Sequence, residues 1–160
     1  MKEQNKDNQA GNTVQPAEYK ESMQNELNTF LTLCLPESGR IYEPQGRHSK
    51  LLHIRESFEK FWILQKDSRI IGTVAVSRLP DGNCELKCLY LYQEYQGLGY
   101  GRKMIETAMD YARKQGYEWM YLDTMRTSER ALGLYKRTGF TQTERYNNNK
   151  YADVFMRCRL

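Results

Sequence analysis

The sequence predicts a single α/β (α+β) domain, built on a mixed central β-sheet with helices on both faces. The main observation is a strand, a glycine-rich loop, a helix and a second strand that follow one another over residues 84–123. The second strand, residues 119–123, is almost continuously apolar, as is typical of parallel strands covered on both sides. A length of 160 residues also fits one domain. We therefore expect a βαβ core at residues 84–123.

The first part of the chain divides into a polar tail and a patterned segment. Residues 1–15 offer almost nothing to bury, so we interpret them as a flexible polar tail, and residues 16–160 as the domain. Apolar residues recur at helical spacing over residues 16–35, and Pro16 suits a first helical turn, which predicts a helix there. The patterns that follow predict a short helix at 49–57, paired strands at 58–65 and 69–79, and the central strand at 84–92.

The chain after the glycine-rich loop predicts two helices and a hairpin. One helix begins near residue 102 and ends before Gly116, a residue type that favours the position just past a helix. Beyond the apolar strand, a second helix is expected at about 128–138, and paired strands at 140–146 and 151–159 across a turn at 147–150.

Composition excludes several classes of protein. A net charge of +4 is too small to indicate a nucleic-acid partner. The four cysteines form no C-x-x-C pair and there are only two histidines, so we expect no metal site. Free thiols fit a reducing compartment, and no apolar stretch reaches the roughly 20 residues that span a bilayer. The sequence therefore predicts a cytoplasmic protein with no membrane partner.

The loop at residues 96–101 predicts an anion site. Glycines at alternate positions let backbone N–H groups approach a ligand, and the helix that follows begins with unpaired N–H groups. Phosphate is the anion that such a site favours. The Rossmann pattern fails because Arg102 stands where its third glycine would be, and the Walker pattern fails because Met104 follows Lys103. A dinucleotide-binding oxidoreductase is therefore disfavoured.

Three segments resemble the GNAT (Gcn5-related) N-acetyltransferase family. They are the central strand with its Gln96-x-x-Gly99-x-Gly101 loop, the run at 122–124, and the A-x-x-x-Y-x-x-x-G-F pattern at 131–140. The resemblance covers about residues 58–160. It implies a GNAT-like domain that moves an acetyl group from acetyl-CoA, as co-substrate, directly to an amine acceptor in a ternary complex. A homodimer stays open. The alternative is a catalytically silent acyl-CoA-binding sensor or interaction module.

The resemblance also implies where acetyl-CoA would bind. The backbone of Leu91 and Tyr92 would lie along the pantetheine arm. The pyrophosphate would be held by the glycine loop and the residue after it, namely Gln96, Gly97, Leu98, Gly99, Tyr100, Gly101 and Arg102. Ser128 stands where many members have an asparagine that bonds the cofactor. We expect its hydroxyl to cap the helix, with a cofactor bond as the alternative.

Two residues are implied as catalytic groups. Glu85 is a candidate general base acting through water, with a structural salt bridge as the equal alternative, since an unpaired buried charge is costly. Tyr135 resembles the family's general acid, against the alternative of a core tyrosine.

The acceptor is left open by the sequence. Small amines, amino acids, antibiotics and protein lysines all remain candidates, and Tyr42, Trp62 and Tyr146 are candidate contacts to the acceptor. The family's usual first strand has no clear counterpart, unless residues 13–15 form a short one.

Overall fold

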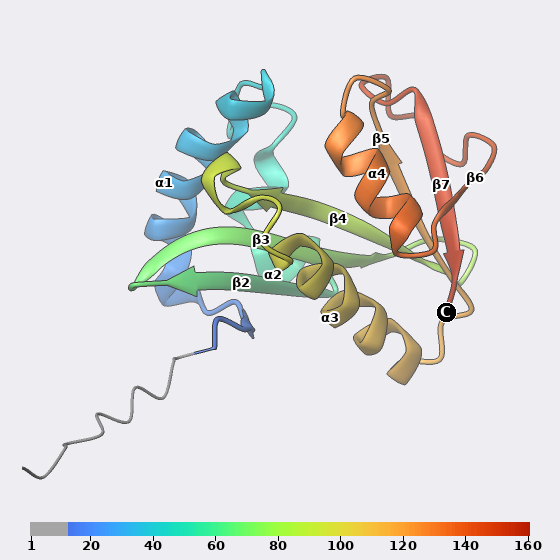
Figure 1. Ribbon diagram of the computed structural model, residues 1–160, viewed down its shortest axis with the longest axis horizontal. Helices are drawn as coiled ribbons and strands as arrows, with labels where there is room; N and C mark the ends of the chain where they lie inside the picture. The colour runs from blue at the N-terminus through green and yellow to red at the C-terminus, as the bar shows by residue number, and fades with distance from the viewer. Residues whose placement is uncertain (1–12) are drawn as a thin grey trace, which may run out of the picture.

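A computed structural model describes residues 13–160, which form one seven-stranded mixed sheet with the strand order β1-β2-β3-β4-β5-β7-β6 (Figure 1). Most of the expected tail, residues 1–12, lies outside the described residues. At the edge of that segment, the carbonyl of Val14 accepts a hydrogen bond of 2.8 Å from Lys103 Nζ. The strands are β1 Pro16–Glu18, β2 Lys60–Lys66, β3 Arg69–Arg78, β4 Cys84–Leu91, β5 Trp119–Thr124, β6 Thr141–Gln142 and β7 Val154–Arg159.

The missing first strand lies inside the segment expected to be helical. β1 pairs antiparallel with β2, with Pro16 opposite Leu64, and the α-helix α1 begins only at Gln24 and runs to Cys34. Because β1 is an edge strand, Pro16 can lack an N–H without breaking a ladder. The helical spacing was correct for 24–34 but wrong for the first residues of the segment.

Helices cover both faces of the sheet, as predicted. Phe61 and Trp62 are neighbours on β2 and so point to opposite faces. Trp62 packs edge-on against Tyr111 of α3, with ring centroids 5.4 Å apart, and Phe61 packs against Phe58 at 5.4 Å. The remaining helices are η1 Glu21–Met23, η2 Leu35–Ser38, η3 Ser49–Leu52, α2 Ile54–Ser57, η4 Gln93–Tyr95, α3 Tyr100–Lys114 and α4 Glu129–Arg137. No helix within residues 13–160 is long and apolar enough to cross a membrane.

The βαβ core is confirmed, and its two strands separate soon after they meet. β4 and β5 are parallel but pair only at Cys84 with Met120 and Glu85 with Tyr121. Beyond Glu85 the two strands diverge, as Figure 1 shows. The backbone groups of β4 that face β5 therefore have no ladder partner along the rest of the strand.

A β-bulge lies in the separated part of β4. Ala75 is opposite Lys87 while Thr73 is opposite Tyr90, so β4 carries one residue more than β3 over this stretch. Cys88 adopts φ +53°, a left-handed conformation uncommon for a residue with a side chain, and its carbonyl accepts a 2.7 Å bond from Thr73 Oγ1. Bulges of this kind redirect the strand that carries them.

The C-terminal hairpin is much shorter than expected. β6 covers only Thr141–Gln142, and a long loop separates it from β7. The Thr143 N–H still donates to the Phe155 carbonyl at 2.9 Å. Beyond Thr143, Tyr146 and Asn147 bond to side chains outside the hairpin, and this explains why residues 144–146 do not pair with β7.

Candidate active site

A cleft of about 1210 Å³ opens where β4 and β5 separate. Its walls come from the end of α1 and the segment that follows it, from β4, from the end of β5, from the start of α4 and from the loop before β7. Segments far apart in the chain therefore meet at one place, beside the bulge of β4. The lining residues predicted from sequence are Glu85, Leu91, Gln96, Ser128 and Tyr135.

The glycine loop connects the end of the cleft to helix α3. Gly97 and Gly99 have φ +77° and +88°, and a Cβ built on either would meet no atom within 4 Å, so the space beside both is open. The first helical bond of α3 runs from Lys103 N–H to the Gly99 carbonyl at 3.1 Å. The N–H groups of Tyr100, Gly101 and Arg102 precede that bond, as in any helix start, and are free to hold an anion.

Gly101 has a different role from the other two loop glycines. Its φ is not positive, and a Cβ there would lie only 2.8 Å from Leu134 Cδ2 of α4. Gly101 therefore allows α3 and α4 to pack closely, and a substitution at this position would report on packing as well as on a ligand.

Gln96 braces the loop. Its amide Nε2 donates to the Leu91 carbonyl at 3.2 Å, and its Oε1 accepts from Arg130 Nη1 at 3.1 Å. The Arg102 side chain turns elsewhere, since it donates to the Arg137 carbonyl at 3.3 Å and pairs with Glu106 at 3.7 Å. Of Arg102, only the backbone is placed to meet a phosphate.

Of three other expected cofactor contacts, Leu91 and Ser128 line the cleft and Tyr92 does not. Tyr92 is buried, its N–H donates to the Ile71 carbonyl at 3.1 Å and its carbonyl accepts from Tyr95 N–H at 3.0 Å, so its backbone is already bonded. Ser128 makes no side-chain cap bond with α4, contrary to the expected capping role, and it lines the cleft. The alternative, a bond from Ser128 to the cofactor, stays a prediction.

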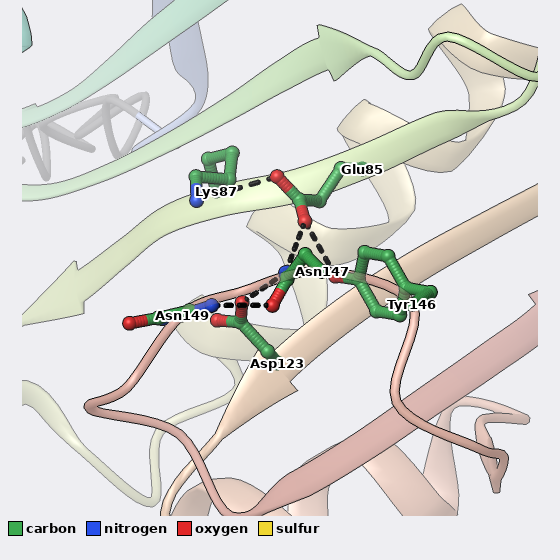
Figure 2. Close-up of polar contacts among 6 residues, drawn as sticks. All are labelled: Glu85, Lys87, Asp123, Tyr146, Asn147 and Asn149. Atoms are coloured by element: carbon green, nitrogen blue, oxygen red, sulfur yellow. Dashed lines mark hydrogen bonds and ion pairs between the residues drawn. The ribbon is translucent and has the colours of Figure 1, made fainter.

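Glu85 lies where β4 and β5 part, and several donors surround its buried carboxylate (Figure 2). Oε2 accepts from the Tyr146 hydroxyl at 2.5 Å and from Asn147 Nδ2 at 3.4 Å, while Oε1 pairs with Lys87 Nζ at 3.3 Å. Asn147 also donates to Asp123 Oδ2 at 2.6 Å. These contacts offset the cost of burying the charge, and Glu85 still lines the cleft.

Tyr135 is a buried residue of α4 whose ring packs edge-on against Phe140, with centroids 5.9 Å apart. Burial raises the pKa of its phenol to about 12, against a smaller lowering by the positive charge of Arg40. The side chain lines the cleft, so a proton held on it is available at neutral pH. The structure thus brings Tyr135 and Glu85 into the same cavity.

The three expected acceptor residues separate. Trp62 faces α3 and is not among the residues that line the cleft, so it is withdrawn as an acceptor contact. Tyr42 also lies outside the lining, beside His48 at 5.7 Å between ring centroids. Tyr146 is also absent from the lining, and its hydroxyl bonds to the Glu85 carboxylate. Sequence reasoning missed Arg40, which does line the cleft, because nothing in its local pattern distinguishes it from a surface arginine.

Among residues 13–160, no group of three or more histidine, cysteine, aspartate or glutamate side chains is arranged to hold a metal ion.

Comparison with curated proteins shows that the chain is similar in sequence to N-acetyltransferases. An N-acetyltransferase 8B of Homo sapiens is 30% identical over 96 residues, covering 57% of this chain and 42% of that protein. An uncharacterized N-acetyltransferase of Schizosaccharomyces pombe is 39% identical over 92 residues, covering 56% of each. The matched regions thus span about half the length of these curated relatives.

Solved structures show the same fold. An acetyltransferase of the GNAT family from Staphylococcus aureus superposes with a TM-score of 0.83 at 20% identity, covering 91% of this chain and 98% of that one. A PaiA N-acetyltransferase from Thermoplasma acidophilum, solved in complex with coenzyme A, gives 0.75 at 18% identity, covering 92% and 99%. The family described as "Acetyltransferase (GNAT) family" matches residues 21–140. The chain therefore belongs to the GNAT acetyltransferase family.

Proposed function

We propose that this chain transfers an acetyl group from acetyl-CoA directly to an amine, with both substrates bound in the cleft between β4 and β5. One observation carries the proposal: Gln96, the first residue of the glycine loop, borders the same cavity as the pair Glu85 and Tyr135. The PaiA relative in fold is described as a complex with coenzyme A, which agrees with this use of the cleft.

The residues present fit the co-substrate. Open space beside Gly97 and Gly99, with three N–H groups at the start of α3, suits a pyrophosphate. The unpaired edge of β4 beyond Glu85 suits the amide groups of a pantetheine arm, which would bond to it as a further strand does. Ser128 adds a hydroxyl with no cap bond to make.

The chemistry requires two proton movements. Acetyl-CoA supplies the acetyl group as a thioester, and the attacking nitrogen forms a C–N bond as the C–S bond breaks. Glu85 would take the proton that the amine gives up, through an intervening water, because its carboxylate is held by Tyr146 and Asn147 but borders the cavity. Tyr135 would donate the proton that neutralises the departing thiolate. Backbone N–H groups near the bulge at Cys88 would stabilise the oxyanion.

The decisive test uses a matched pair of glycine substitutions. Gly99→Asp adds a side chain and a negative charge where the phosphates would lie. Gly116→Asp makes the same change at φ +82°, also in open space, but beyond the other end of α3. Both should strain the backbone similarly, so differences in melting temperature should be small.

Calorimetry should show acetyl-CoA binding lost in Gly99→Asp and kept in Gly116→Asp. Thiol release from acetyl-CoA with a panel of amines should likewise be lost in Gly99→Asp and kept in Gly116→Asp. Equal binding by both variants would remove the glycine loop from the site. Normal binding by the parent protein with no turnover on any amine would favour the silent acyl-CoA-binding module.

A further inference from the structure

An arginine without a partner lies in the wall of the cleft. Gly39, with φ +76°, ends η2, and the Arg40 N–H donates back to the Leu35 carbonyl at 3.2 Å. This turn brings the half-buried Arg40 to the cavity. Its Nε is one of two buried side-chain nitrogen or oxygen atoms within residues 13–160 that have no hydrogen-bond partner.

A buried guanidinium N–H without a partner is costly, because the group has lost water and gained nothing in return. Arg40 forms none of the ion pairs found among the described residues. The position is held by the turn at Gly39 rather than by a bond from the side chain. A ligand that accepts from Arg40 would remove this cost.

Two further cationic side chains add to the positive charge of this wall of the cleft. Arg47 and Lys50 line the same wall, and the Arg47 guanidinium stacks 3.7 Å from the centre of the Tyr151 ring. Neither side chain takes part in an ion pair within residues 13–160.

The carboxylates of the cleft are engaged elsewhere or exposed. Glu37 accepts from the Gln93 N–H at 2.8 Å, Glu59 from the Tyr117 hydroxyl at 2.6 Å, and Asp123 from Asn147. Glu85 has the partners described above, and Glu56 and Glu129 are exposed at the border. None of them forms an ion pair with Arg40, which leaves its charge for a ligand.

The unpaired charge of Arg40 borders the same cavity as the proposed catalytic residues. The positive charge of Arg40 opposes the rise that burial causes in the pKa of both Tyr135 and Tyr90. Arg40 and Tyr135 line the same cavity, so a group held by Arg40 would share the cleft with the hydroxyl that we assign as the general acid. This arrangement suits an acceptor in which the amine and the anionic group belong to one small molecule.

We propose that the acceptor is an amine that also carries a carboxylate, and that Arg40 binds this carboxylate. The planar guanidinium fork matches a carboxylate in geometry and charge, and Arg47 and Lys50 favour the same anion. The site therefore prefers amino acids and related amino-carboxylates to polyamines and other purely cationic amines. This inference rests on the proposed acetyl transfer and names its substrate class.

The test compares molecules that differ only in the carboxylate. Phenylalanine, phenylalaninamide and phenethylamine form one set, and lysine and cadaverine form another, with O-phosphoethanolamine added as a phosphate-bearing amine. Thiol release and mass spectrometry of the N-acetyl product give kcat/KM for each. We expect the carboxylate member of a set to exceed its partners by at least about tenfold, the effect of one charged hydrogen bond.

Variants assign the preference to Arg40. Arg40→Gln should lower kcat/KM for the carboxylate member roughly 10- to 100-fold and leave the amide unchanged. Arg40→Glu should reverse the order and favour cadaverine, which a merely structural role would not produce. Arg55→Gln is the matched control, because Arg55 is exposed on α2, pairs with Glu21 at 3.5 Å and does not line the cleft.

The outcomes separate this inference from the proposed function. Turnover that is equal or better without the carboxylate would overturn the inference and leave acetyl transfer intact, as would a preference for O-phosphoethanolamine. Weaker acetyl-CoA binding in Arg40→Gln would assign Arg40 to the co-substrate and also overturn it. If no amine is acetylated, calorimetry in the presence of CoA tests the inference. Binding of phenylalanine or lysine by the parent protein but not by Arg40→Gln would support it, and no binding, or equal binding by both proteins, would refute it.

Discussion

Replacing Tyr135 by phenylalanine tests the proposed general acid most directly. The change removes one hydroxyl and keeps the ring that packs against Phe140. No hydrogen bond from the Tyr135 hydroxyl to another described residue is found, so its removal leaves no protein group unpaired. We therefore expect the free energy of unfolding to change by less than about 1 kcal/mol.

The effect on turnover should be far larger than the effect on stability. Loss of a positioned proton donor typically lowers a rate by roughly 10²–10⁴-fold. At about 1.36 kcal/mol for each tenfold change, this corresponds to about 2.7–5.4 kcal/mol in the activation barrier. Because the pKa of the phenol is raised to about 12, the donor stays protonated in the parent enzyme over the whole neutral range. The loss in Tyr135→Phe should therefore be nearly constant between about pH 6 and pH 9.

The assay measures thiol release, acetyl-CoA affinity and chemical denaturation on the same preparations. Tyr111→Phe is the matched control, since Tyr111 is half-buried on α3, bonds to Glu59 at 3.3 Å and lies outside the cleft. It should keep full activity. Tyr135→Ala should in addition lose roughly 3–5 kcal/mol of stability, as aromatic truncations in cores do. Near-normal turnover in Tyr135→Phe would refute the assignment and leave water as the proton source.

Four further outcomes follow from the structure. Glu85→Gln keeps the shape of the side chain and should lower kcat by about 10² or more if Glu85 takes the amine proton; unchanged kcat would leave only the ion-pair role. Tyr146→Phe removes the 2.5 Å bond to Glu85 and should cost roughly 1–3 kcal/mol in denaturation experiments. Burial raises the pKa of Tyr135 from 10.0 to about 12, so the folded protein keeps this proton at a higher pH than the unfolded chain does. The free energy of unfolding should therefore fall as the pH rises from 10 to 12, and it should fall less in Tyr135→Phe. Gly101→Ala should destabilise by about 1–3 kcal/mol, and Leu134→Ala in the same chain should recover part of that loss; additive losses would argue against the contact.

The fold could be predicted because its signals are local and repeated. An apolar strand, a glycine-rich turn and an amphipathic helix identified the βαβ core, and the bounds of α3 and β5 agree within two residues. β1 was missed because three residues at a sheet edge carry too short a pattern to compete with the helical spacing that follows. Its position depends on pairing with β2, which is a long-range contact.

The site could be predicted only in part, for a similar reason. Glu85 and Tyr135 belong to motifs, and the structure brings both to the cleft. The backbone of Tyr92 was expected to be free, but Ile71 and Tyr95 already bond to it. The bulge at Cys88 shifts the register of β4 against β3, and alternation along the sequence gives no sign of it.

The shortened hairpin explains how a glutamate can occupy the central strand. Had residues 144–146 continued the ladder with β7, Tyr146 and Asn147 would be committed to that hairpin, and Glu85 would keep only Lys87 as a partner. Because the chain leaves β7 after the Thr143 bond to Phe155, it brings a hydroxyl and an amide to the point where β4 and β5 part. Asn149 then fixes the turn, because its N–H donates to Asn147 Oδ1 at 3.0 Å. In place of further ladder bonds from β6, the loop thus makes bonds that hold a charged group at the edge of the cleft, where the proposed mechanism requires a proton acceptor.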